Sequence, residues 1–234
     1  MASGKEVTRI ITLETYLQHH FKKGILQPPL FTSWEKALRF EMSEPGVSMN
    51  APSGLKRAIH RSVTLFDEVF GDEDTLLVVA DVYTKKNHDF FEKRPLSVYR
   101  TFVKTQEVLD QMRHELVTEP RSTEGEEMVT HRFLQPCRKK DLHYGLMFET
   151  KCFEQERMPI TGLKKQPGSR FEIYYLNQTR HIIFHLFSER GCDIIAADMD
   201  EIRPLYDKYN GWIEKSYRSM IDARFTEPST GLKR

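Results

Sequence analysis

The stretch "FEIYYLNQTRHIIFHLFSERGCDIIAA", Phe171 to Ala197, decides the fold of this 234-residue chain. It holds three runs rich in β-branched and aromatic residues, FEIYYL, HIIFHLF and CDIIAA, separated by the short polar segments NQTR and Glu189-Arg190-Gly191. Such runs, broken by turn-forming residues at short intervals, are typical of neighbouring β-strands joined by tight turns. The stretch therefore predicts three consecutive strands of one sheet.

Hydrophobic periodicity predicts the other elements on either side of this stretch. Apolar residues three or four positions apart indicate helices, whereas alternating or continuous short apolar runs indicate strands. The expected helices begin at Leu13 behind a Thr12 cap and end before Gly24, then cover Leu55–Phe70, Gln106–Leu116, Leu142–Phe153 and Ile202–Ile213. Further strands are expected at Leu38–Met42, Asp74–Tyr83 and Met128–Leu134.

Together these elements predict one α+β domain over residues 1–225, with an antiparallel or mixed sheet covered by several amphipathic helices. Residues 226–234 are expected to be a disordered tail. Lysine and arginine number 35 against 34 aspartates and glutamates, so no excess of positive charge predicts a nucleic-acid partner. The longest strongly apolar run, Leu76 to Ala80, is far too short for a membrane span, and "MASGKEVTR" lacks a signal sequence. We expect a cytoplasmic protein.

Metal and disulfide sites are not expected from the cysteines and histidines. Three widely spaced cysteines without a CxxC pair predict reduced, partly buried thiols, and no cofactor motif is present. His181 and His185 have the HxxxH spacing of a helical metal pair, but their neighbours favour a strand. Four strand steps separate the two Cα atoms by roughly 13 Å, too far to share one ion. Both histidines are expected to line one sheet face.

The segment around Glu189-Arg190-Gly191 has two competing interpretations. In the first, it is a structural turn: Gly191 takes a positive φ, and Asp193, opposite Leu186, forms an ion pair with Arg190. In the second, exposed charges at a strand end bind a ligand or a protein. The candidate functional patch then consists of His185, Glu189, Arg190, Asp193 and Trp212.

Trp212 belongs to this patch because of its place in the helix that follows. The apolar spacing of Ile202, Leu205, Tyr206, Tyr209 and Ile213 predicts a stripe that faces the core. Asn210-Gly211 predicts a break in the helix directly before Trp212. A tryptophan at such a break is often half exposed and can anchor a partner.

Four segments resemble a known family: PLFTSWEKALRFEM, RAIHRSVTLFDEVFGDEDTLLVVADVY, EIYYLNQTRHIIFHLFSERGCDIIAA and IRPLYDKYNGWI. In this order they are similar to bacterial proteins known as domain of unknown function 3885, from about Leu30 to Phe225, except for Arg94 to Glu127. Members of that family carry an acidic residue, Arg, Gly, any residue and Asp at the turn, as Glu189 to Asp193 do here. The resemblance implies no activity, cofactor or catalytic residue.

Two functional hypotheses follow. The first is a protein-binding module, such as an immunity-type protein that neutralises a toxin, because charges of both signs are abundant and no catalytic signature is present. The alternative is an uncharacterised enzyme, such as a hydrolase, that uses His185, Arg190 and Asp193 near the sheet edge. Convergence of these three side chains on a pocket would favour the enzyme.

Overall fold

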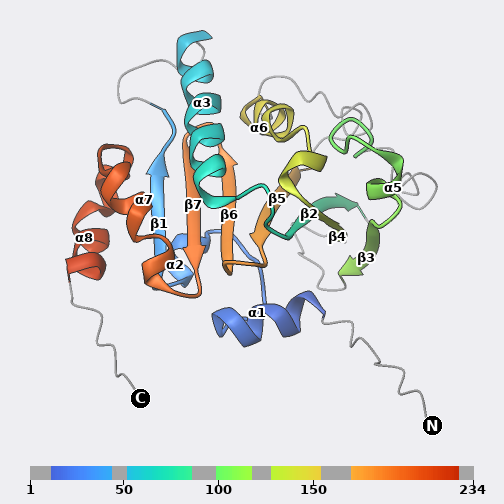
Figure 1. The fold of residues 1–234 in the computed structure, drawn as a ribbon, viewed down its shortest axis with the longest axis horizontal. Coiled ribbons are helices and arrows are strands. Elements are labelled where there is room, and N and C mark those ends of the chain that lie inside the picture. Colours follow the sequence, from blue (N-terminus) through green and yellow to red (C-terminus); the bar gives the residue numbers. More distant parts are fainter. Residues whose placement is uncertain (1–11, 44–51, 86–98, 118–127, 154–169, 227–234) are drawn as a thin grey trace.

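The computed structural model describes residues 12–43, 52–85, 99–117, 128–153 and 170–226, and they build one α+β fold around a single sheet (Figure 1). Every pair of neighbouring strands is antiparallel, and the strand order is β1-β7-β6-β5-β2-β4-β3. The strands are β1 (Ala37–Glu41), β2 (Leu76–Lys85), β3 (Arg113–Val117), β4 (Met128–Cys137), β5 (Arg170–Asn177), β6 (Ile182–Ser188) and β7 (Gly191–Ala196). The predicted fold class is confirmed, and the sheet is antiparallel throughout.

The three strands predicted from Phe171 to Ala197 are adjacent in the sheet, as β5, β6 and β7. Tyr175 pairs with Phe184 in the β5–β6 hairpin. His185 pairs with Asp193 in the β6–β7 hairpin, which has an irregularity between Leu186 and Ser188. Register fixes which face each side chain takes, because alternate residues of a strand point to opposite faces. His185 and Asp193 therefore share one face, opposite the face of Phe184.

Two helices cover the face that carries Phe184 (Figure 1). They are α3 (Pro52–Val69) and α6 (Tyr144–Cys152). The ring of Phe66 on α3 lies 5.2 Å from the ring of Phe148 on α6, 5.2 Å from Tyr175 and 5.4 Å from Phe184. Aromatic pairs at these separations stabilise a core beyond their buried area. This aromatic cluster joins both helices to β5 and β6.

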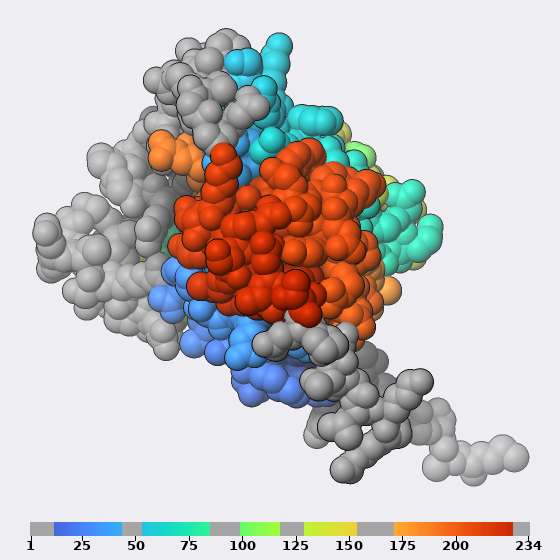
Figure 2. All heavy atoms as spheres, turned by 90° about the vertical axis from the view of Figure 1, so that its left-hand side faces the viewer, coloured from blue at the N-terminus to red at the C-terminus, as the bar shows by residue number. Residues whose placement is uncertain are grey.

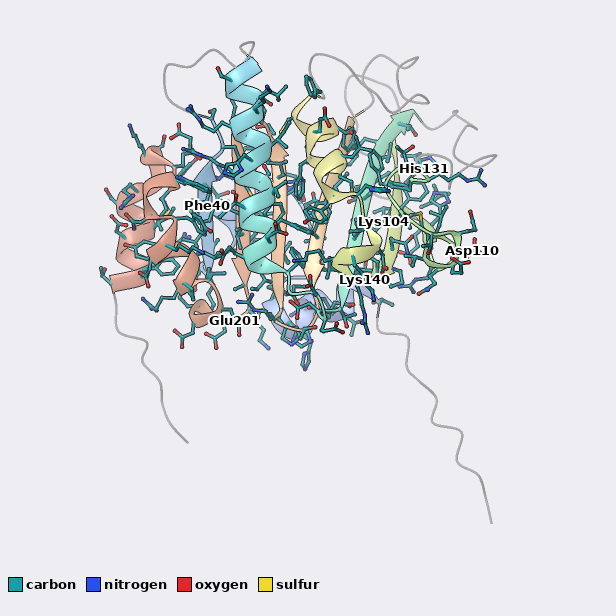
Figure 3. The ribbon with its side chains drawn as sticks, turned by 45° about the horizontal axis from the view of Figure 1, so that its top comes forward. Phe40, Lys104, Asp110, His131, Lys140 and Glu201 are labelled. Atoms are coloured by element: carbon teal, nitrogen blue, oxygen red, sulfur yellow. The ribbon has the colours of Figure 1, made fainter. Side chains whose placement is uncertain are left out.

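The remaining helices are α1 (Leu13–Phe21), α2 (Leu30–Ser33), α5 (Gln106–Leu109), α7 (Arg203–Lys208) and α8 (Arg218–Thr226). They lie at the margins of the sheet, except α2, which packs against β7 and β1 on the face that carries Asp193. The side view shows α7 and α8 covering the end of the sheet at β1 (Figure 2). There the backbone N–H of Glu214 donates to the carbonyl of Arg39, and Phe40, labelled on β1 in Figure 3, forms a bridge with Ile213. The chain itself thus protects the outer edge of β1.

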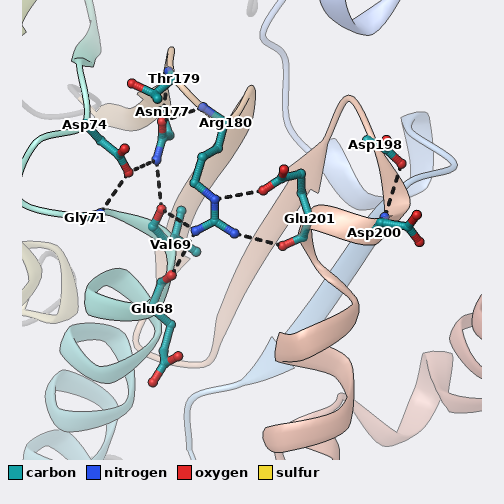
Figure 4. Close-up of polar contacts among 10 residues, drawn as sticks. All are labelled: Glu68, Val69, Gly71, Asp74, Asn177, Thr179, Arg180, Asp198, Asp200 and Glu201. Carbon is teal, nitrogen blue, oxygen red and sulfur yellow. Dashed lines mark hydrogen bonds and ion pairs between the residues drawn. The ribbon is translucent and has the colours of Figure 1, made fainter.

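The turn between β5 and β6 is attached to the C-terminal end of α3 by polar side chains (Figure 4). Asn177 accepts hydrogen bonds from the backbone N–H groups of Thr179 and Arg180, and its amide donates to the carbonyl of Val69. The Arg180 guanidinium also donates to the Val69 carbonyl and forms an ion pair with Glu201 at 2.8 Å. These bonds satisfy the turn and a carbonyl group that α3 leaves unpaired at its end.

The helix expected over Gln106–Leu116 was wrong in its second half. Thr105 caps α5 by accepting from the N–H of Val108, but the helix ends at Leu109. Residues Arg113–Val117 instead form β3, which pairs with β4 along its whole length. Pairing with an available strand edge satisfies these backbone groups, and it outweighs a local helical pattern.

The three cysteines are partly or fully buried thiols, as the sequence predicted. Cys137, Cys152 and Cys192 are all free, and burial raises the pKa of Cys137 and of Cys152 to about 12. These two thiols are therefore protonated at neutral pH. In the part of the chain that the structure describes, no helix has the length and apolar character to cross a membrane.

Candidate functional site

The five residues of the predicted patch do not form one surface. His185 and Asp193 are fully buried and Glu189 is nearly so, whereas the Arg190 side chain is 73% exposed. Trp212 is half-buried beside Tyr209, and the Arg61 guanidinium lies 4.8 Å above its ring. His185 and Asp193 lie side by side inside the molecule, whereas Glu189 and Arg190 contact each other at the turn. The expectation of a patch of exposed charges is wrong for three of its members.

Asp193 forms a buried ion pair with Arg39, not with Arg190. The Arg39 guanidinium donates to both carboxylate oxygens, at 2.6 and 2.8 Å, and the backbone N–H of Phe31 donates to the same carboxylate at 3.1 Å. Register explains the pair, because Asp193 lies opposite Arg39 on one side and His185 on the other. The expected pairing with Leu186 was off by one position. Arg190 contacts Glu189 instead, at 3.4 Å.

Aromatic rings surround the guanidinium of Arg39. Its central carbon lies 5.1 Å from the ring centre of Phe31, 4.8 Å from Phe187 and 5.3 Å from Tyr217. Burial on its own lowers the pKa of Arg39, but the hydrogen bonds and charge of Asp193 outweigh it and raise the pKa above its usual value. Arg39 is therefore a permanent cation, held by one carboxylate and three rings.

Gly191 is required for close packing and not for a left-handed turn. It is the first residue of β7, and its φ lies outside the positive range that the turn interpretation expected. A Cβ atom at this position would overlap the ring of Phe187, whose Cε2 would be only 2.7 Å away. Because that ring also covers Arg39, the glycine gives the ring the space to lie there.

A second, largely buried group lies next to Asp193 and consists of His185 on β6, Glu172 on β5 and Lys151 on α6. His185 Nε2 donates to the Glu172 carboxylate at 3.0 Å, and the Lys151 ammonium lies 3.3 Å from the same oxygen. Lys151 is only 4% exposed and also donates to the Phe171 carbonyl at 2.8 Å. Burial alone raises the pKa of Glu172, but His185 and Lys151 outweigh it, and the pKa lies below its usual value. The carboxylate is thus ionised at neutral pH.

The same sheet face carries a second arginine–aspartate pair. Arg132 on β4 donates two hydrogen bonds of 2.8 Å to Asp81 on β2, and it also lies 3.4 Å from Glu14 on α1. Asp81 pairs in register with Arg132 on one side and with Glu172 on the other. We call the residues Arg39, Asp193, His185, Glu172, Asp81 and Arg132 the buried charge row. It crosses the sheet from β1 to β4.

Sequence reasoning missed four members of the buried charge row: Arg39, Glu172, Asp81 and Arg132. A usable signal was present, because each is a charged residue inside a predicted strand. Asp81 interrupts the apolar run LLVVADVY, in a strand that is covered on both faces. A buried charge of this kind needs a partner of opposite sign. The partner itself depends on strand order, which one sequence does not reveal.

His181 does not share a sheet face with His185, contrary to expectation. It lies in the β5–β6 turn with a positive φ of 52°, and its Nδ1 is hydrogen-bonded to the hydroxyl of Tyr16 at 3.0 Å. Its ring stacks on that of His20 with 3.7 Å between the centres. Among the described residues, no three His, Cys, Asp or Glu side chains are arranged to hold a metal ion.

The helical stripe predicted beside Trp212 is largely confirmed. Ile202, Leu205, Tyr209 and Ile213 are buried. The helix is shorter than expected, because α7 ends at Lys208 and a 3₁₀ turn, Asn210–Trp212, follows. Tyr206 is half-buried, and its ring stacks on Phe225 of α8 with 4.4 Å between the centres. The stripe thus packs against both the core and α8.

The chain is therefore a single-sheet α+β protein whose most organised polar feature is an interior row of charges. A family model described as "Domain of unknown function (DUF3885)" matches residues 13–216, so the chain belongs to that family, as the resemblance implied. It is 29% identical over 216 residues to the "Uncharacterized protein YnaE" of Bacillus subtilis (strain 168), covering 88% of this chain and 98% of that protein. No solved structure matches the chain.

Replacing Gly191 with alanine should destabilise the fold by about 1–3 kcal/mol, because the added methyl group overpacks against Phe187. Gly211→Ala is the matched control, since a Cβ there has nothing within 4 Å. The free energy of unfolding, measured in urea, checks both variants. Adding Phe187→Leu should remove part of the Gly191→Ala penalty. An undiminished penalty in that double variant would show that the backbone, and not the ring, requires glycine.

Asp193→Ala should destabilise the fold by about 3–5 kcal/mol, because it leaves the buried Arg39 guanidinium without its carboxylate. Arg190→Ala should cost less than about 1 kcal/mol, since its side chain is exposed and, among the described residues, forms an ion pair with Glu189 alone. Chemical denaturation of the two variants makes the comparison. Equal stability of Asp193→Ala and the parent protein would refute a structural role for this carboxylate.

The stabilising effect of Glu172 should depend on pH. Its pKa is lower in the folded state than in the unfolded chain, so its contribution is complete above the unfolded value of about 4.3 and is lost as pH falls through the folded pKa. The stability difference between the parent and Glu172→Gln should therefore be largest near neutral pH and shrink in acid. Glu149→Gln, exposed on α6, is the control. A difference that is constant with pH would contradict the assignment.

Proposed function

We propose that this chain is a cytoplasmic protein-binding module that takes up an extended segment of a partner protein along β3. The observation that carries this proposal is the position of β3 at the end of the sheet. Its one strand neighbour is β4, and no strand of the described residues pairs with its other side. Its side chains are largely exposed, and Leu116 is 52% exposed.

The two ends of the sheet differ in how they are protected. At β1, residues Ile213 and Glu214 bond to the outer strand, as described above. Along an outer strand, alternate backbone N–H and C=O groups point away from the sheet and can pair with another chain. Proteins that bind extended peptides use such an edge, and the main-chain hydrogen bonds supply affinity. The five residues of β3 offer roughly 17 Å of edge.

The side chains of β3 suggest what the partner segment carries. Arg113 and Glu115 are exposed on one face of the strand, and Leu116 is exposed on the other. Opposite charges on facing strands attract, and like charges repel. A segment with an apolar residue for Leu116 and charges complementary to Arg113 and Glu115 would fit. Our specific hypothesis is that this binding neutralises a toxin.

The hydrogen bonds that His185 and Asp193 form inside the fold support the protein-binding hypothesis over the hydrolase hypothesis. Asp193 is bonded to Arg39 and Phe31, and His185 donates to Glu172. Arg190 lies outside, on the exposed turn. A nucleophile–base pair has to reach a substrate, whereas these carboxylate and imidazole groups are used within the fold. The hydrolase therefore stays the second hypothesis, and no observation on these residues favours it.

Affinity capture from host extract tests the proposal with two matched variants. Leu116→Lys places a charge on the β3 edge, and Met220→Lys makes the same change at a 46%-exposed methionine on α8. Both should fold with stability within about 0.5 kcal/mol of the parent. We expect one protein to be retained by the parent and by Met220→Lys, and to be lost with Leu116→Lys.

Two outcomes would contradict the proposal. In the first, Leu116→Lys retains the same protein as the parent. In the second, no protein is captured specifically and a broad hydrolase screen detects turnover. The first outcome would place the binding surface elsewhere. The second would favour the enzyme hypothesis. Binding of a synthetic peptide taken from the captured protein, followed by hydrogen exchange at the β3 amides, would then locate the contact.

A further inference from the structure

A pocket separate from the buried charge row and from β3 lies between the end of α1, the end of α2 and the end of β7. Its volume is about 410 Å³, within the range of small-molecule sites. The lining residues that matter for its chemistry are His20, Phe21, Lys22, Lys23, Trp34 and Lys36. The floor on the sheet side is small and apolar, formed by Ile195, Ala196 and Ala197.

Positive charge exceeds negative charge around this pocket. Among the described residues that line it, Lys22, Lys23 and Lys36 supply three ammonium groups and Glu35 supplies one carboxylate. Lys22 donates to the carbonyl of His19 at 3.1 Å and Lys36 to that of Ala197 at 2.6 Å. Carbonyl groups are neutral, so these bonds position the two ammonium groups without cancelling their charge. The site therefore favours an anion.

The helix dipole at this end of α1 acts in the opposite direction but is weaker. The C-terminus of a helix carries about half a negative charge. Lys22 ends α1 in the left-handed conformation, with φ of 59°, which is common at helix C-termini. This conformation directs the chain past the pocket, so that Lys22 and Lys23 both line it. Three lysines against one glutamate leave a positive excess of about two charges, which outweighs the dipole.

Aromatic side chains form one wall of the pocket. The rings of Phe21 and Trp34 meet edge to face with 5.3 Å between their centres, and both residues are mostly buried. His20 is held in place by its stacking on His181. Phe21 and Trp34 are 8% and 6% exposed, so a planar ring in the pocket would contact them over a small area by dispersion. Apolar surface and ammonium groups thus occur together in one cavity.

We infer that this pocket binds a small molecule in which a phosphate group is joined to a planar ring, as in a nucleoside monophosphate. The ammonium groups of Lys22, Lys23 and Lys36 would hold the phosphate, because flexible ammonium groups are good ligands for it. The ring would lie against Trp34 and Phe21. This site does not depend on the binding proposed for β3.

Adenosine monophosphate, adenosine and inorganic phosphate are the probes that test this inference. Trp34 and Trp212 are the two tryptophans of the chain, so a Trp212→Phe variant reports Trp34 fluorescence alone. Adenosine monophosphate should quench this signal and bind at least about tenfold more tightly than adenosine or inorganic phosphate, since it uses both halves of the site. Its affinity should fall as salt is added.

Substitutions of single lysines locate the phosphate. Lys22→Gln and Lys23→Gln should each weaken adenosine monophosphate binding about two- to fivefold, the effect of one exposed charge. Lys140→Gln is the control, because this exposed lysine, labelled in Figure 3, does not line the pocket. Absence of binding by all three probes would overturn the inference. Equal affinity for the nucleotide and inorganic phosphate, or equal loss in the Lys140→Gln control, would overturn it as well.

Discussion

The buried pair between Arg39 and Asp193 is the interaction on which most of this structure depends. Its two residues lie 154 positions apart in the chain, and the Asp193 carboxylate also accepts a hydrogen bond from the backbone N–H of Phe31 in α2. Residue Glu214, 3.9 Å from Arg39, and the ring of Tyr217 add the C-terminal region. One guanidinium thus joins β1, β7, α2 and the segment before α8. Loss of either partner would leave a buried charge, which is costly compared with a typical stability of about 5–15 kcal/mol.

The Glu189-to-Asp193 turn has a physical explanation in these contacts. Asp193 holds the guanidinium of Arg39, and the ring of Phe187 covers it. Gly191 leaves room for that ring. The turn therefore supplies the Asp193 carboxylate and the Phe187 ring that enclose the Arg39 cation, and Gly191 leaves the space that this ring needs. Arg190, the most conspicuous residue of the turn in the sequence, lies outside this arrangement.

Sequence periodicity predicted two kinds of element: those that pair with a neighbour in the sequence and those with a long apolar pattern. The β5–β6–β7 strands, the long helix α3 and the apolar strand β2 all lie where the patterns placed them. The helix predicted through Leu116 was wrong because β3 is stabilised by β4, an interaction that periodicity does not contain. Asp193 was correctly identified as needing a partner. Its partner lies 154 positions away in the chain and depends on which strands are neighbours.

For the candidate patch, too, the sequence pattern did not reveal which residues become neighbours in the fold. Composition identified charged residues near a turn, but exposure depends on the side of the sheet that the register gives to each residue. His185 and Asp193 occupy an inner face, whereas Arg190 occupies the exposed turn. Surfaces that the sequence did not indicate are instead the β3 edge and the pocket beside α1. The pocket is formed by segments that are distant in the chain, and the outer side of β3 has no strand partner among the described residues.

A double replacement tests most directly whether Arg39 and Asp193 serve the fold as one unit. Arg39→Met and Asp193→Leu should each be strongly destabilising, because each leaves one charge buried without its partner. The variant with both changes should recover most of that loss, since it buries neither charge, and keep only the cost of the unpaired Phe31 N–H, about 1–3 kcal/mol. Unfolding free energies that simply add in the double variant would contradict the account.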